Sequence, residues 1–266
     1  MIFDKITNRD LDSLGPLQPE GWGDIVPSFK FYLELPFCFP VKTIVNEKIA
    51  GIGAAIILEG TAWLAHIIVG PENRKQGIGS EITGHLLELT REQGCKTVSL
   101  IATAMGRPVY QKIGFADQEE YVFYQRETPL ADRRVPDSIS GFREENRAGI
   151  LELDRALSGE GRSRLLEKHL RNSYLHLSSG RMDGYYLPGL GEGLIMAENQ
   201  RAGIELLKLK LSLSVKNVLP AGNRPGVAFM QEIGFRETKR ATRMVWGQRF
   251  PWQPDNMFGR IAGNLG

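Results

Sequence analysis

The sequence predicts an α/β (α+β) protein of two tandem domains, each with a mixed, mostly antiparallel sheet flanked by helices. Three observations support this prediction. Strand-like apolar segments follow one another between residues 29 and 69, and an amphipathic helix then joins two strands. In addition, a segment that ends in Gly114-Phe115 has a faint repeat ending in Gly234-Phe235, 120 residues further along (234 − 114), which is about one domain length.

The strand-like region from residue 29 to residue 69 predicts an antiparallel meander. Turn-forming residues interrupt it at 46–48 and 59–61, so strands are expected at 41–45, 49–58 and 61–69. The preceding residues are rich in Gly and Pro and predict short helices and loops. Within them Trp22 is a large anchor that either packs in a surface loop or lines an acceptor site.

Residues 63–94 are the most informative stretch and predict a strand, a short loop and a helix. Apolar residues recur in the helix at spacings of four, four and three, at Ile78, Ile82, Leu86 and Leu89. Gly94 ends the helix, and a strand is expected at 97–102. Because a helix connects them, this strand should lie parallel to the strand that ends at residue 69.

The start of this helix has the features of an anion-binding site. Its first amide N–H groups have no partner within the helix, and the helix dipole adds partial positive charge. Gly77 and Gly79 allow an anion to approach the backbone, and Arg74 and Lys75 add full charges beside it. The stretch therefore predicts a diphosphate site.

Two common nucleotide-binding loops are excluded at this position. A P-loop requires Gly-Lys-Ser/Thr, whereas Gly77 is followed by Ile78 and Gly79. A dinucleotide fingerprint requires a third glycine where Ile82 stands, and an acidic residue where residues 101–103 read Ile-Ala-Thr. The pattern that remains is Arg-x-x-Gly-x-Gly at residues 74–79.

The rest of the chain predicts a short helix before Gly114-Phe115, a last strand of the first domain near 120–125, and a charged, proline-broken linker at 127–137. This divides the chain into domains at 1–126 and 138–266. In the second domain, helices are expected at 144–157 and 162–170 and a strand at 208–218. Its chemistry is predicted to be lost, because Met230 replaces Tyr110 in the repeat and residues 194–199 lack the Gly-x-Gly loop.

Composition excludes several classes of function. The chain of 266 residues has 33 basic and 31 acidic residues, a net charge of +2, and no basic run longer than Arg133-Arg134, so nucleic acid is not an expected partner. Two cysteines show no disulfide framework and no metal spacing. No signal peptide or membrane-spanning run is present, so a soluble, cytoplasmic protein with no metal and no membrane partner is expected.

The loop at 74–79, after a strand ending Ile67-Ile68-Val69, resembles the coenzyme A loop of the GNAT N-acetyltransferases. The whole chain resembles a bacterial subgroup of tandem GNAT proteins related to the YitH-type acetyltransferases, with a degenerate second domain. The shared residues are Gly21-Trp22, Trp63-Leu64, the segment 102–110, Leu153-Asp154, the segment 162–166 and Arg243-Met244. The sequence departs from this subgroup at Ile101 and Ala104, and from many GNAT enzymes at Thr103.

This resemblance implies an acetyl-CoA-dependent N-acetyltransferase in which an amine attacks the thioester directly. It implies that Tyr110 is the general acid that protonates the departing thiolate. It also implies that a backbone N–H near Val69 donates a hydrogen bond to the developing oxyanion. His66 and Glu34, the latter in a strand-like stretch, are weaker candidates for the base, and water relays also serve in this fold. The implied cofactor-binding residues are Ile67, Ile68, Val69, Arg74, Lys75, Gln76, Gly77, Ile78, Gly79 and Ser80.

The implied acceptor is a primary amine on a small molecule or peptide, and the protein is expected to be a monomer or homodimer. A different class of function stays open, which is a non-catalytic sensor or scaffold of GNAT fold that binds acyl-CoA. Release of free thiol in the presence of an amine would distinguish the enzyme from the sensor.

Overall fold

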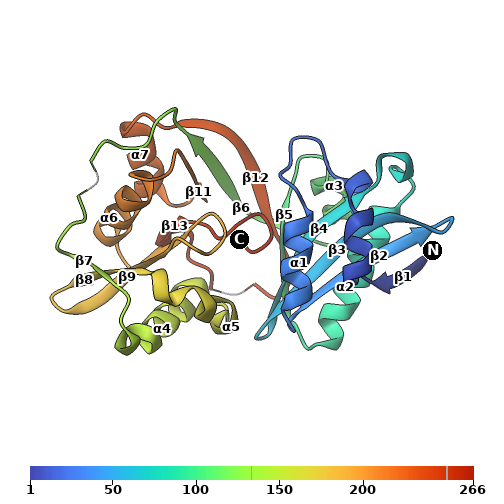
Figure 1. Cartoon of the computed structure of the whole chain (residues 1–266), viewed down its shortest axis with the longest axis horizontal. Helices are drawn as coiled ribbons and strands as arrows, with labels where there is room; N and C mark the ends of the chain where they lie inside the picture. The colour runs from blue at the N-terminus through green and yellow to red at the C-terminus, as the bar shows by residue number, and fades with distance from the viewer. Residues whose placement is uncertain (133, 250) are drawn as a thin grey trace. The chain divides into compact units, whose positions relative to one another are not determined.

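The structure is a computed structural model that describes residues 1–132, 134–249 and 251–266 (Figure 1). These residues form two compact units. Unit 1 contains Met1–Asp117, Met244–Arg249 and Gly263–Leu265, and unit 2 contains Gln118–Arg243, Phe250–Ala262 and Gly266. The predicted division at a 127–137 linker stays a prediction, and Arg133 within that linker lies outside the described residues.

Unit 1 is a sheet whose strands follow one another in the order β1-β2-β3-β4-β5, with the end of β12 beside β5. The strands are β1 (Ile2–Lys5), β2 (Cys38–Val45), β3 (Lys48–Leu58), β4 (Thr61–Val69), β5 (Thr97–Ala102) and β12 (Arg236–Gly247). The helices are α1 (Val26–Glu34), α2 (Ile78–Glu92) and α3 (Arg107–Lys112). The antiparallel meander β2-β3-β4 and the parallel β4-β5 pair confirm the predicted order.

Helix α2 packs closely on β3 because two residues of that strand are glycines. A Cβ atom at Gly51 would lie 2.7 Å from Cδ1 of Ile82, and one at Gly53 would lie 2.9 Å from Cδ1 of Leu86. Both of these α2 side chains are fully buried in the core of unit 1. The predicted apolar face of the helix is therefore confirmed, and its contact with β3 fixes where α2 begins relative to β4.

The prediction of a strand-like stretch at residues 29–34 is wrong, because these are the last six of the nine residues of α1. Pro27 occupies the first turn of that helix, where its missing N–H is not needed, and Leu35 before Pro36 ends it. Phe29 and Tyr32, three residues apart, are both fully buried. The apolar residues that suggested a strand are therefore spaced so that they lie on the buried face of a helix.

The last strand of unit 1 is also different from the prediction. The strand near 120–125 exists as β6 (Ala116–Gln125), but it pairs with β11 (Lys216–Pro220) in unit 2. The place beside β5 is taken by the end of β12, whose Met244 is buried in the unit 1 core. Further along the chain, the Gln248 amide donates to the Lys96 carbonyl at 2.9 Å.

Unit 2 contains β6, β11 and the first part of β12, and a second sheet in the order β13-β10-β9-β8-β7. The strands of this sheet are β7 (Ile139–Gly141), β8 (Tyr174–Ser178), β9 (Arg181–Leu187), β10 (Leu194–Ala197) and β13 (Met257–Gly259). The helices are α4 (Arg147–Ser158), α5 (Ser163–Leu166), α6 (Gln200–Leu211) and α7 (Arg224–Glu232). Helices were predicted near α4 and α5.

The predicted strand at 208–218 is wrong in its first half, where Lys208–Leu211 is the last turn of α6. The alternation of Lys and Leu there resembles a strand. However, Leu207 and Leu211, four residues apart, are both fully buried, and Lys210 is buried with Nζ donating to the Gly193 carbonyl at 3.1 Å. Burial of a lysine in this position is a tertiary effect that local alternation does not reveal.

Candidate functional site

The first feature of the site is an open edge of β4. One edge of this strand pairs with β3 as far as Val69, opposite Gly51. The other edge pairs in parallel with β5, and among the described residues this pairing ends at Trp63 opposite Ser99. Beyond Trp63 no described strand pairs with this edge of β4, and an unpaired strand edge can bind another extended chain or a ligand.

A β-bulge lies within this open part of β4. Ala65 pairs with Ala54 and Ile68 pairs with Ile52, so that His66 and Ile67 together lie opposite Gly53 alone. His66 has a positive φ of 47°, which is uncommon for a residue with a side chain. Bulges of this kind redirect side chains and occur often beside active sites.

The His66 side chain is held by a hydrogen bond and surrounded by aromatic rings. Its Nδ1 atom lies 2.7 Å from the Tyr32 hydroxyl, which in turn accepts a hydrogen bond of 2.7 Å from Nδ2 of Asn264. The ring centroids of Trp22, Phe29 and Tyr32 lie 6.1, 5.7 and 5.6 Å from that of His66. Burial lowers the pKa of His66 to about 4, so that its imidazole is neutral at pH 7.

Beyond β4, the loop and the start of α2 present unpaired backbone amides. The amides of Ser80 and Glu81 both donate to the Gly77 carbonyl, at 2.9 and 3.1 Å, so the amides before Ser80 are those that a helix leaves without an intrahelical partner. Gly77 is the N-cap, with φ of 85° and no side-chain cap. Among the flanking residues, Lys75 also has a positive φ, of 62°.

The charged side chains of this loop are exposed. Arg74, Lys75, Gln76 and Ser80 are exposed, whereas the Ile78 side chain is buried in the core and offers only its backbone. Arg74 donates from Nε to the Val69 carbonyl at 3.2 Å, which keeps its guanidinium beside the end of β4. The basic side chains Arg74 and Lys75 therefore lie beside the unpaired amides, with Glu72 and Glu81 as acidic residues of the same stretch.

The two glycines of the loop have different reasons to be glycine. Gly77 has the left-handed backbone that side chains disfavour. Gly79, in contrast, has room for a Cβ atom, whose nearest neighbour would be Cγ2 of Val69 at the ordinary distance of 3.7 Å. The packing of the fold does not require a glycine at position 79, whereas close approach of a ligand to the backbone would.

Tyr110 lies on α3 and packs against the same core as Ile67 and Val69. Its ring is edge-on to Phe115 with centroids 6.0 Å apart, and its carbonyl accepts the Phe115 amide at 3.0 Å. Burial raises the pKa of Tyr110 to about 12, so that the hydroxyl keeps its proton at neutral pH. Glu34 lies apart from this core, exposed at the end of α1.

Sequence reasoning missed two residues of this arrangement, Tyr32 and Asn264. They are separated from each other by 232 positions, and Tyr32 is 34 positions from His66. A motif search cannot find such a set because the residues share no local spacing. Only the hydrogen-bond geometry brings them together.

Unit 2 repeats the local turn after α3 with a different residue at the position of Tyr110. The Phe235 amide donates to the Met230 carbonyl at 3.0 Å, and the Gly234 amide donates to the Gln231 carbonyl at 3.1 Å. The corresponding bonds of Phe115 and Gly114 have the same lengths. The predicted repeat therefore has the same backbone turn in both copies, while fully buried Met230 replaces the tyrosine.

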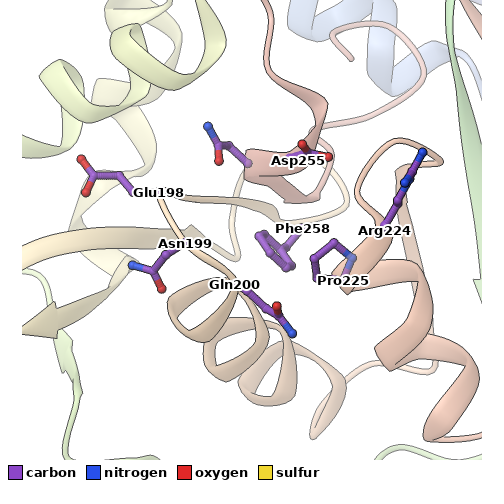
Figure 2. A pocket seen from close by; sticks show the side chains of 8 residues that line it. Glu198, Asn199, Gln200, Arg224, Pro225, Asp255 and Phe258 are labelled. Carbon is purple, nitrogen blue, oxygen red and sulfur yellow. The ribbon is translucent and has the colours of Figure 1, made fainter.

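Two helix starts of unit 2, those of α6 and α7, are capped by asparagine side chains. Asn199 accepts the Ala202 amide at 3.0 Å at the start of α6, and Asn223 accepts the Gly226 amide at 2.8 Å at the start of α7. Figure 2 shows these two helix starts around a pocket of about 380 Å³, with Arg224 extending away from Phe258. Its lining residues are Glu198, Asn199, Gln200, Arg224, Pro225, Asp255, Asn256 and Phe258.

None of the described helices is both long enough and apolar enough to cross a membrane. In the same part of the chain, no group of three or more His, Cys, Asp or Glu side chains is placed to hold a metal ion.

The family model of the acetyltransferase (GNAT) family matches residues 8–115. The matched segment is therefore similar to acetyltransferases of this family. It contains the open edge of β4, the loop, the start of α2 and Tyr110, so the segment that the family model matches also contains the candidate site. No curated protein matches the chain significantly.

Solved structures show that the fold of the whole chain is shared with GNAT proteins. A candidate acetyltransferase from Pyrococcus horikoshii is similar with a TM-score of 0.84 and 21% identity, over 100% of this chain and 95% of that one. A tandem GNAT protein from the clavulanic acid biosynthesis pathway has a TM-score of 0.60 and 15% identity, over 92% and 98%. A GCN5-related N-acetyltransferase from Sphaerobacter thermophilus has a TM-score of 0.65 and 13% identity, over 95% and 98%.

Proposed function

We propose that the chain is an N-acetyltransferase that transfers the acetyl group of acetyl-CoA to a primary amine at the site in unit 1. The observation that carries this proposal is the continuity of the open β4 edge with the uncapped start of α2. In coenzyme A, the extended arm would lie along the β4 edge, and the diphosphate that follows the arm would lie at the start of α2. Gly79, which the packing does not require, lies where such a diphosphate would approach.

The proposed cofactor-binding residues act mainly through their backbone. The amides near Gly77, Ile78 and Gly79 would hold the diphosphate, with charge from Arg74 and Lys75 and polar groups from Gln76 and Ser80. The edge at Ile67, Ile68 and Val69 would bind the extended arm as an added strand. Bound acetyl-CoA would supply the thioester that the amine attacks.

Two residues of the chain would then assist the transfer. The backbone N–H near Val69, on the open edge of β4, would donate to the carbonyl oxygen as negative charge develops there. The Tyr110 hydroxyl, which keeps its proton at neutral pH, would protonate the departing thiolate. The ammonium proton would leave to water or to a surface carboxylate, and Glu34 stays a candidate because it is exposed.

We further propose two tandem GNAT-like domains, at 1–126 and 138–266, with the second one degenerate. The shared turn at Gly114 and Gly234 supports a repeated fold, as does the likeness in fold to a tandem GNAT protein. Loss of the second site is supported by Met230 and by the asparagine that caps α6. We propose that the protein is cytoplasmic, as a monomer or homodimer.

The experiment that tests the function compares two glycines of α2. CoA at a hundredfold excess over its Kd should stabilise the wild-type protein by about 2.7 kcal/mol in a thermal unfolding assay. Gly79→Glu should abolish this effect because it places a carboxylate at the proposed diphosphate position. Gly84→Glu is the matched control, because Gly84 is exposed in the same helix and a Cβ atom there has open space.

A thiol-release assay with amino acids, polyamines, aminoglycosides and peptide N-termini then separates catalysis from binding. Release of CoA thiol with at least one amine is expected. Stabilisation without thiol release from any amine would favour the acyl-CoA sensor instead. An equal response to CoA in the two glycine variants would contradict both functions.

A further inference from the structure

The hydrogen bonds Asn264 to Tyr32 to His66 form a chain that ends beside the bulge of β4. Nδ2 of Asn264 donates to the Tyr32 hydroxyl oxygen at 2.7 Å, and this hydroxyl lies 2.7 Å from Nδ1 of His66. All three residues belong to unit 1. Asn264 lies between exposed Gly263 and buried Leu265, which anchors the segment in this unit.

The direction of this chain follows from the number of protons on each group. The Asn264 amide nitrogen only donates, so the Tyr32 oxygen accepts from it. Burial raises the pKa of Tyr32 above its ordinary value, and the hydrogen bond from Asn264 lowers it by a smaller amount. The hydroxyl therefore keeps its one proton. The Tyr32 hydroxyl therefore donates a hydrogen bond to Nδ1 of His66. A neutral imidazole whose Nδ1 accepts a hydrogen bond has its proton on Nε2.

The surroundings of His66 favour the neutral form. The rings of Trp22 and Phe29 lie beside the imidazole, and Tyr32 is the titratable group that contacts it. The cause that lowers the pKa of His66 is burial, with no contribution from a charged neighbour among the described residues. Hydrogen bonding therefore selects the tautomer, while burial selects the charge state.

We propose that Asn264 is a positioning residue that acts through Tyr32 to hold His66 as an Nε2–H donor at the bulge of β4. The inference deepens the proposed function, on which its consequence for transfer rests. In that function His66 orients the acceptor amine by donating a hydrogen bond to it or to its carrier. It does not act as the general base, because its basic nitrogen is already occupied by Tyr32.

The tautomer can be measured directly at pH 7 by long-range ¹H–¹⁵N spectra of the ¹⁵N-labelled full chain. The chain has four histidines, and the signals lost in His66→Gln identify residue 66. Wild type should show an unprotonated Nδ1 and a protonated Nε2. A protonated Nδ1 in the wild-type protein would overturn the proposal.

Asn264→Asp tests whether Asn264 determines the tautomer of His66. The introduced carboxylate can only accept, so Tyr32 should donate to it and Nδ1 of His66 should become the protonated nitrogen. An unchanged tautomer in a folded Asn264→Asp variant would refute the role of Asn264. Asn8→Asp, at an exposed position of the same unit, adds the same charge and should leave the tautomer unchanged.

Tyr32→Phe provides a second variant that preserves the ring. It removes the proton donor to Nδ1, and both His66 tautomers should then be populated, whereas Tyr174→Phe in unit 2 should have no effect. A single tautomer in Tyr32→Phe would contradict the proposal. In the transfer assay, Asn264→Asp should lower kcat/KM for the acceptor at least tenfold with CoA stabilisation unchanged.

The spectra need no acyl donor, so their result is independent of the proposed function. If the glycine comparison in α2 fails while the tautomer is as expected, the proposed function is wrong and the positioning role of Asn264 stands. The opposite combination would leave the acetyltransferase in place with a different role for His66.

Discussion

His66 has an uncommon backbone conformation and a side chain whose pKa is lowered by burial. The backbone has a positive φ, and the imidazole is buried among aromatic rings with its Nδ1 atom against Tyr32. A non-glycine residue in the left-handed region costs about 1–2 kcal/mol, which the pairing of β3 and β4 on either side of the bulge must offset. Strain of this kind at the end of an open strand supports a functional role.

The low pKa of His66 predicts a loss of stability in acid. In the unfolded chain histidine titrates at about 6.5, whereas burial lowers the folded pKa to about 4. Between these values the unfolded state binds the additional proton, so the free energy of unfolding falls as the pH decreases from 6.5 to 4. The loss attributable to His66 is at most about 3 kcal/mol, and above pH 6.5 it vanishes.

Urea unfolding of His66→Gln at several pH values measures this contribution. The variant should lose less stability than wild type between pH 6.5 and 4. His85→Gln, which replaces a ring stacked on Phe3, serves as the control for the loss of an imidazole. Parallel pH profiles for His66→Gln and wild type would show that another group is responsible.

Tyr110 is the residue on which the proposed chemistry depends most. Tyr110→Phe should lower kcat about a hundredfold, in the range of general acid catalysis, because the departing thiolate loses its proton source. The KM for acetyl-CoA should change little, since the proposed binding groups are elsewhere. Steady-state kinetics by thiol release measures both, and Tyr174→Phe controls for loss of a hydroxyl. An unchanged kcat would remove Tyr110 from the mechanism.

At the scale of elements, a buried ion pair joins α4 to the start of α5. Arg162 donates from Nη2 and Nε to the two carboxylate oxygens of Asp154, at 2.6 and 3.1 Å, and the Tyr185 hydroxyl also donates to Asp154. The side chains of both partners are 2% exposed. Asp154 and Arg162 are both among the residues on which the predicted resemblance of the second domain to a GNAT subgroup rests, and their ion pair is a structural reason for both residues.

Removing one partner of this pair should be costly because the other charge stays buried. Arg162→Met should lower the free energy of unfolding by about 3–5 kcal/mol. Arg164→Met, at an exposed position of the same helix, should change it by less than about 0.5 kcal/mol. Urea unfolding measures both values. A small effect of Arg162→Met would mean that water or a neighbour replaces the guanidinium.

At the scale of the whole molecule, unit 1 is completed by residues from late in the chain. Met244 is buried in its core, Trp246 packs against that core, and the Gln248 amide bonds to Lys96. A Cβ atom at Gly247 would lie 2.3 Å from the Lys96 carbonyl oxygen, so the close approach there requires glycine. The compact unit is therefore not the same as the predicted domain at 1–126.

This composition of unit 1 predicts that residues 1–126 do not fold stably alone. The fragment lacks the strand beside β5 and leaves part of an apolar core uncovered. Far-UV circular dichroism and amide proton dispersion should report a disordered or aggregated chain. Fusing residues 236–249 after residue 126 through a Gly/Ser linker should restore a cooperative unfolding transition. A cooperatively folded fragment 1–126 would show that the late strand is dispensable.

The sequence by itself determined the elements whose signals are local. The meander, the helix with Ile78, Ile82 and Leu86 on one face, and the parallel crossover follow from hydrophobic period and turn chemistry over short distances. The start of α2 without a side-chain cap, with exposed basic residues beside it, was also predictable, because glycine offers no capping side chain.

The tertiary structure alone decided the features that depend on contacts between segments distant in the sequence. Residues 29–34 form a helix because Phe29 and Tyr32 are buried on one face, and the end of β12 lies beside β5 because its apolar residues fill the core of unit 1. The contact of Asn264 with Tyr32 spans 232 positions. Local patterns have the range of a few residues, whereas burial and hydrogen-bond satisfaction are properties of the folded chain.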